Sequence, residues 1–137
     1  MELHITSKED LLKEAYKIQD YLDMVMSENP PEEAVQRGND LSAYLARTTK
    51  MLADAKYHLN TTTKTDVFEI LKDAAKHAGA TPSAINKLVK SASKEEQYLV
   101  DLIERLNAAC THQIDWCRTI ISKAKTEMQY TSRGGGF

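Results

Sequence analysis

Apolar residues recur along this chain at alternating steps of four and three, the repeat of helices that lie lengthwise against other helices. The longest such run follows Ser93, and no Pro or Gly interrupts it before Tyr130. Its apolar or small positions are Leu99, Ile103, Leu106, Cys110, Cys117, Ile120 and Ala124. The spacing predicts a helix over about 94–130, about 54 Å long at the usual rise per residue. A helix of that length needs an equally long partner, from the same chain or from a second copy.

A second long run keeps the same alternation and is the natural partner. It comprises Ala34, Gly38, Leu41, Leu45, Thr48, Leu52, Ala55 and Leu59. This run predicts a helix over about 31–59, roughly 43 Å long. Before it, Thr6 or Ser7 is placed to cap an N-terminal helix over about 8–27. That helix should stop before Pro30 and Pro31, because a second consecutive proline cannot continue it.

Between the two long helices, the pattern predicts a shorter pair. The polar stretch 60–65 breaks the periodicity and is expected to be a loop. Helices over about 66–78 and 82–91 then form a helical hairpin, with Gly79 ending the first and Pro82 opening the second. The fold class is therefore all-α, a helical bundle of five helices in a single domain (residues 1–130). The Gly-rich residues 131–137 are expected to form a flexible tail.

Composition narrows the classes of function. The chain has 137 residues and a net charge of -2, which argues against a dedicated, broadly basic nucleic-acid protein. Cys110 and Cys117 would lie about 10.5 Å apart on one helix, too far for a disulfide, so we expect free thiols in a reducing cytoplasm. No apolar run is long enough to cross a membrane, and the first residues lack the apolar region of a signal peptide.

The middle of the last helix carries the most distinctive side chains. At about 100° per residue, one stripe beside the apolar seam contains Arg105, His112, Trp116, Thr119 and Lys123. Asp115 lies three residues from His112 and is placed to hydrogen-bond it. Trp and Arg dominate the energetics of protein interfaces, so the stripe is a candidate partner-binding surface. The alternative is a solvated face with Trp116 at the edge of the seam.

Two other features are candidates for nucleic-acid binding. The spacing of Ala75, Gly79, Ile85 and Leu88 resembles the helix-turn-helix of DNA-binding repressors. That resemblance implies that Ser83, Asn86, Lys87 and Lys90 face a groove, with phosphate contacts from Lys72, Lys76 and Lys94. A structural hairpin produces the same pattern. The second feature is the outer face of the second helix, which Arg47, Lys50, Asp54 and His58 share. The alternative is a solvated face of side chains paired three and four residues apart.

The segments Leu45–Asn60 (LARTTKMLADAKYHLN) and Arg105–Met128 (RLNAACTHQIDWCRTIISKAKTEM) resemble small all-helical accessory proteins of tailed phages and prophages. The layout of two long helices is also similar to phage recombination mediator proteins. This second resemblance implies a helical oligomer that loads a recombinase onto single-stranded DNA. The near-neutral charge differs from the basic surface that such loading requires.

We expect a non-enzymatic protein, because nucleotide-binding glycine loops, HExxH, CxxC and GxSxG motifs are all missing. No catalytic residue, metal or cofactor is expected. The leading hypothesis is a homo-oligomeric accessory protein that binds a partner protein, such as a host factor or a defence component, in the cytoplasm of a host cell if the chain is phage-encoded. One alternative is a DNA-binding accessory in recombination, replication or transcription. Another is an oligomer that sequesters a small ligand between its subunits.

Overall fold

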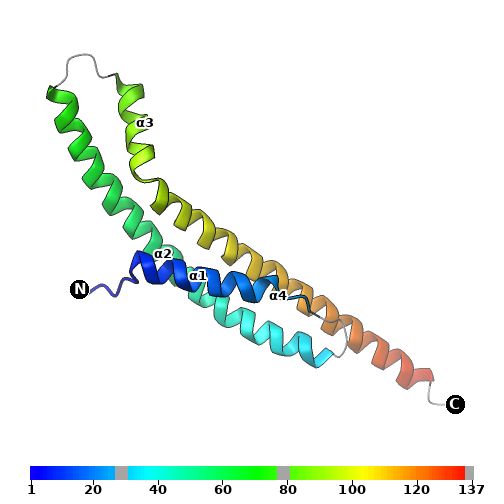
Figure 1. Ribbon diagram of the computed structural model, residues 1–137. Helices are drawn as coiled ribbons and strands as arrows, with labels where there is room; N and C mark the ends of the chain where they lie inside the picture. The colour runs from blue at the N-terminus through cyan, green and yellow to red at the C-terminus, as the bar shows by residue number, and fades with distance from the viewer. Residues whose placement is uncertain (27–30, 77–80, 135–137) are drawn as a thin grey trace.

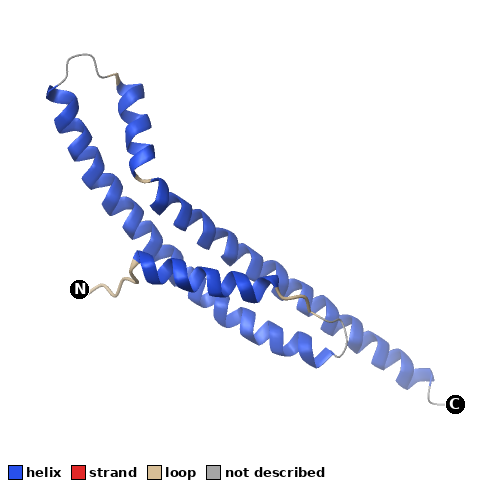
Figure 2. Ribbon diagram, in the orientation of Figure 1, coloured by secondary structure: helices blue, strands red, loops and turns tan. Residues whose placement is uncertain are grey.

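The computed structural model describes residues 1–26, 31–76 and 81–134, with the side chains of 74, 75 and 132–134 left out. These ranges contain helices α1 (Lys8–Asp23), α2 (Pro31–Lys76), α3 (Pro82–Ala92) and α4 (Lys94–Gly134), and no strand (Figures 1 and 2). In Figure 1, α2 and α4 run side by side in opposite directions, and α1 lies along one side of the pair. The all-α bundle predicted from the heptad spacing is confirmed.

Helix α1 begins where its cap was expected and ends earlier than expected. Ser7 is the N-cap, and its side chain accepts a hydrogen bond from the Asp10 amide at 3.2 Å. The helix was predicted to reach residue 27 but stops at Asp23, and Met24 is already extended. The carbonyl of Leu22 accepts from the side chains of Arg37 and Gln113, so other helices satisfy the end of α1. Residues 27–30 lie outside the described residues.

The predicted loop at 60–65 is wrong, because α2 continues through it to Lys76. The hydroxyl of Thr61 donates to the Tyr57 carbonyl at 2.8 Å, and that of Thr65 donates to the Thr61 carbonyl at 3.0 Å. These bonds satisfy the polar side chains within the helix, so the threonines do not end it. The helices expected over 31–59 and 66–78 are therefore one helix. Residues 77 and 78 and the predicted cap Gly79 lie outside the described residues.

The other two helices match their predicted starts. Thr81 caps α3 by accepting from the Ala84 amide at 3.2 Å, and α3 spans the predicted 82–91 with one residue more. Ser93 separates α3 from α4, and its hydroxyl donates back to the Val89 carbonyl at 3.1 Å. Helix α4 runs to Gly134, so residues 131–134 of the predicted flexible tail are helical. Residues 135–137 lie outside the described residues.

The core follows the predicted seams of α2 and α4, with Met51 and Val100 added from beside them, and one face of α1 completes it. Helix α1 contributes Leu11, Ala15, Ile18 and Leu22; α2 contributes Ala34, Leu41, Met51 and Ala55; α4 contributes Leu99, Val100, Ile103, Leu106, Cys110, Cys117 and Ile120. A Cβ added at Gly38 would lie 3.9 Å from the Cβ of Cys117, which marks the close approach of α2 and α4. Both cysteines are buried free thiols.

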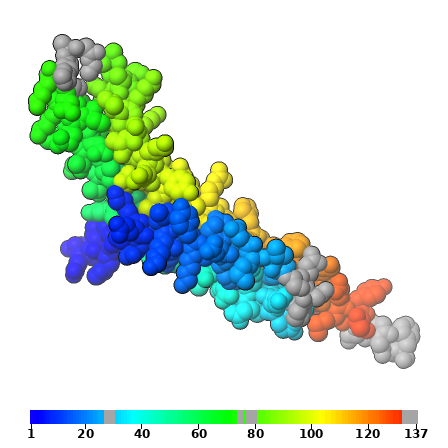
Figure 3. Space-filling model, viewed as in Figure 1, coloured from blue at the N-terminus to red at the C-terminus, as the bar shows by residue number. Residues whose placement is uncertain are grey.

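The molecule divides into a three-helix body and a two-helix arm. We define the arm as residues 61–76 of α2 together with α3, and the body as the rest. Figure 3 shows the arm projecting beyond α1. Helix α3 packs against α2 and makes no contact with α1. None of the described side chains from 61 to 92 is buried, whereas Ser93 and Glu96 are buried where the arm joins the body. The arm therefore lacks a closed core of its own.

Candidate interaction surfaces

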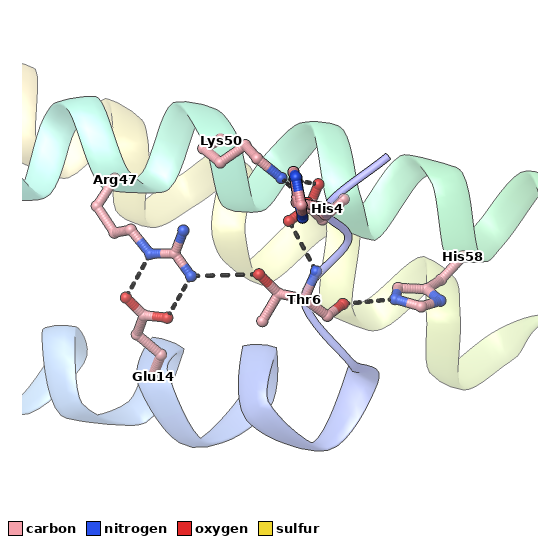
Figure 4. Close-up of polar contacts among 7 residues, drawn as sticks. His4, Thr6, Glu14, Arg47, Lys50 and His58 are labelled. Carbon is pink, nitrogen blue, oxygen red and sulfur yellow. Dashed lines mark hydrogen bonds and ion pairs between the residues drawn. The ribbon is translucent and has the colours of Figure 1, made fainter. Parts of the chain in front are cut away.

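The N-terminal segment is tied to α2 by a polar network (Figure 4). The Arg47 guanidinium makes two hydrogen bonds to the Glu14 carboxylate, at 2.6 and 2.8 Å, and a third to the Thr6 hydroxyl at 3.3 Å. The hydrogen bond from Arg47 is the largest contribution to the Glu14 pKa and holds it below its ordinary value of 4.5, against the effect of burial. Arg47 therefore fixes α1 on α2.

Lys50 is also engaged within the chain. Its ammonium donates to the Asp54 carboxylate and to the His4 carbonyl, the latter at 2.7 Å. Asp54 also accepts from the Thr6 amide at 3.1 Å, and His58 Nε2 lies 2.7 Å from the Thr6 carbonyl oxygen (Figure 4). Arg47 and Lys50, which were candidates for nucleic-acid contact, are therefore both engaged within the chain, Arg47 mainly by Glu14 and Lys50 by Asp54 and the His4 carbonyl.

The predicted stripe on α4 lies on the surface. Arg105, His112, Asp115, Trp116, Thr119 and Lys123 are all exposed, and Trp116 keeps 50% of its surface in solvent. The expected bond between His112 and Asp115 is absent among the described side chains. Asp115 instead accepts from Arg118 at 3.4 Å. The stripe is an accessible helix face, and Trp116 is its one large apolar side chain.

Trp116 borders a hollow where α1 ends. The hollow has a volume of about 240 Å³ and is lined by Leu22, Met24, Met26, Arg37, Gln113 and Trp116. Arg37 is held there by a 2.7 Å hydrogen bond to Gln113 and by the ring of Tyr21, whose centroid lies 4.8 Å from the guanidinium carbon. Burial, together with a hydrogen bond to Asp40, raises the pKa of Tyr21 to about 12. Exposed Met24 and Trp116 beside the half-buried Arg37 suit protein contacts.

A second groove, which the sequence pattern did not reveal, lies between α1 and the start of α4. It has a volume of about 720 Å³ and is lined by Lys8, Glu9, Leu12, Tyr16, Lys94, Glu95, Tyr98 and Leu99. Tyr16 and Tyr98 are about half exposed, and a hydrogen bond between them raises the pKa of Tyr16. Lys8, one of the lining residues, forms an ion pair with Glu96 at 2.8 Å. The paired tyrosines come from segments far apart in sequence, so no local motif marks them.

The remaining candidates for nucleic-acid contact lie on or next to the arm. Lys72, Lys76, Ser83, Asn86, Lys87, Lys90 and Lys94 are all exposed. Helix α3 contains no acidic residue. Three apolar side chains on the arm, which were not proposed as functional, are also exposed: Phe68, Leu71 and Leu88. Lys72 lies over the ring of Phe68, with 4.9 Å from Nζ to the ring centroid. The structure thus brings exposed cations and apolar groups together on the arm.

In the described part of the chain, no group of three or more His, Cys, Asp or Glu side chains is arranged to hold a metal ion. Among the same residues, no helix is long and apolar enough to cross a membrane. Comparisons of the chain with protein families, with curated proteins and with solved structures found no match. The fold and its surfaces define an elongated all-α bundle, and its function is argued from those surfaces.

Proposed function

We propose that this chain is a non-enzymatic interaction protein that self-associates and docks on a partner protein. The observation that carries the proposal is its large exposed surface. The chain exposes 10013 Å², whereas a compact monomer of its mass, 15.4 kDa, exposes about 7,200 Å². The elongated shape accounts for the difference, since few residues have neighbours on every side. A stable interface needs only about 800 Å² from each partner, so there is ample surface to cover.

The exposed surface includes many large apolar side chains, which favours association. Half of them lie on the arm or near helix ends: Phe68, Leu71 and Leu88 on the arm, Met24 and Val25 after α1, and Met128 and Tyr130 near the end of α4. Met128 continues the apolar seam of α4 yet is 73% exposed. Exposure of these apolar side chains to water is unfavourable, and burying them against a second protein would be stabilising.

Trp116 and the methionine hollow are the surface that we assign to a different protein. The resemblance to phage accessory proteins implies a host factor or a defence component as that partner, met in the cytoplasm of a host cell. Trp116 is the anchor in this assignment, and the α4 stripe supplies a polar rim.

Self-association is tested by sedimentation equilibrium across a wide range of protein concentration. We expect a mass that rises toward a multiple of 15.4 kDa with concentration. A single-chain mass at every concentration would contradict the proposal. For the partner surface, Trp116→Ala should lose a partner captured by wild-type protein while keeping the wild-type mass, and Tyr57→Ala is the matched control with a similarly exposed aromatic ring.

Nucleic-acid binding by α3 is the second candidate, and a specific observation favours it. Ser83, Asn86, Lys87 and Lys90 are exposed on a helix without acidic residues. Fluorescence anisotropy with labelled single- and double-stranded DNA should then show binding that weakens steeply with salt. The double variant Lys87→Ala/Lys90→Ala should abolish it, and Lys13→Ala/Lys17→Ala on α1 is the control of equal charge. Equal binding by both double variants would exclude α3.

A further inference from the structure

Most charged residues in the arm part of α2 fall on two sides of that helix, divided by the sign of their charge. Val67 and Ile70 are half-buried and mark the direction of α3. At about 100° per residue, four residues lie on one flank of that direction, rotated from it about the helix axis by roughly 70–170°: Lys64, Phe68, Leu71 and Lys72. Asp66, Glu69 and Asp73 lie roughly 70–130° the other way round, and Lys76 lies about 150° that way, so this side carries three carboxylates and one cation.

Helix α3 extends the same division. Ile85 and Val89 are half-buried toward α2. Leu88 lies on one flank of that direction, and Lys90 lies on the other. In antiparallel helices, equivalent flanks of the two helices fall on the same side, as in antiparallel coiled coils. Leu88 therefore shares the side of Asp66, Glu69 and Asp73, which we call the acidic side. Lys90 joins Lys64, Phe68, Leu71 and Lys72 on what we call the basic side.

Each side combines charge with exposed apolar surface. On the basic side, Phe68 is 63% exposed and Leu71 is 51% exposed; on the acidic side, Leu88 is 56% exposed. Two basic sides, or two acidic sides, would repel one another across a symmetric contact. A basic side and an acidic side are complementary in charge, and each supplies apolar residues to the contact.

We propose that the basic side of the arm binds the acidic side of the arm of a second copy. This inference rests on the self-association proposed above and gives it a location. The contact is head-to-tail, because the two copies use different surfaces. A head-to-tail dimer leaves one basic and one acidic side unpaired, so assembly continues until a ring closes or a filament forms.

The experiment uses charge reversal on each side, leaving Lys87 and Lys90 unchanged. The basic-side variant is Lys64→Glu/Lys72→Glu, and the acidic-side variant is Glu69→Lys/Asp73→Lys. Each alone should weaken association more than about tenfold, since like charges then meet. An equimolar mixture of the two variants should restore association, because one has two acidic sides and the other has two basic sides. The quadruple variant should associate by itself.

Sedimentation velocity measures the outcome, and circular dichroism checks the helix content of each variant. Lys13→Glu/Lys17→Glu on α1 controls for net charge and should associate like wild-type protein. Restoration in the mixture also shows that the single-side variants fold.

Wild-type association in either single-side variant would overturn the arm contact while self-association stands. Failure of the mixture would overturn head-to-tail pairing. A strictly monomeric wild-type protein would instead refute the proposed self-association. Loss of DNA binding by the basic-side variant with unchanged association would assign this side to nucleic acid.

Discussion

Arg47 shows how a single residue joins distant segments of the chain. It binds Glu14 and Thr6, which lie 33 and 41 positions away. We expect Arg47→Ala to lower the free energy of unfolding by about 1 kcal/mol, because the Glu14 pair is partly exposed and the Thr6 hydroxyl loses its donor. Arg47→Lys should recover only part of this, since an ammonium cannot form the two-pronged contact. Urea denaturation measures both, and full stability in Arg47→Ala would contradict the assigned role.

Two buried carboxylates make stability depend on pH. Burial raises the pKa of Glu96 and of Asp54, but hydrogen bonds from Lys8 to Glu96, and from Lys50 and Thr6 to Asp54, outweigh it, and both pKa values lie below their ordinary 4.5 and 3.8. A lowered folded-state pKa stabilises the fold above the ordinary value, and this is lost as pH falls through the folded-state pKa. We therefore expect the unfolding free energy to be steady near neutral pH and to fall below about pH 4.5. Glu96→Gln should be less stable at neutral pH and flatter in acid. A Glu96→Gln profile parallel to wild type would contradict this.

The reactivity of the two buried cysteines reports how often the contact between α2 and α4 opens. Burial raises the pKa of both the Cys110 and the Cys117 thiols, so little reactive thiolate is present at neutral pH. We expect a thiol reagent to modify them only at the rate of unfolding, and addition of denaturant should accelerate the reaction. Immediate modification of the folded protein would show that the α2–α4 seam opens on its own.

At the scale of the helix, α2 is where the sequence pattern predicts least well. The alternating steps of four and three correctly predicted two long helices, because a continuous apolar stripe along a helix is buried only by another long helix beside it. The same reasoning placed a loop at 60–65, where the threonines bond back to the preceding turn instead. Partners far away in sequence were also invisible. The spacing of four residues allows Lys50 to pair with Asp54, but nothing in it indicates the second partner of Lys50, the His4 carbonyl. The pairing of Tyr16 with Tyr98 was likewise beyond the reach of a local pattern.

Thr61 and Thr65 lower the stability of the arm part of α2. Thr is a poorer helix former than Ala by about 0.5 kcal/mol, and Thr61 and Thr65 are exposed, so Thr61→Ala/Thr65→Ala should stabilise the arm helix by about 1 kcal/mol. Where arm amides exchange by local opening, their hydrogen exchange should slow about fivefold. Thr126→Ala, which removes a similar bond on α4, should leave exchange in the arm unchanged. Equal exchange in the double variant and wild type would mean that the arm opens elsewhere.

For the whole molecule, salt separates the two forces that can hold copies together. If the basic and acidic sides of the arms are in contact, their attraction is screened as the Debye length falls from about 30 Å at low salt to about 3 Å at 1 M. Association should therefore weaken steadily with sodium chloride. An assembly held mainly by apolar side chains such as Met128 and Tyr130 would persist in chloride and strengthen in sulfate, which favours burial of apolar surface. Sedimentation in both salts distinguishes them: loss in chloride places the contact on the arms, and persistence in chloride with gain in sulfate moves it to the end of α4.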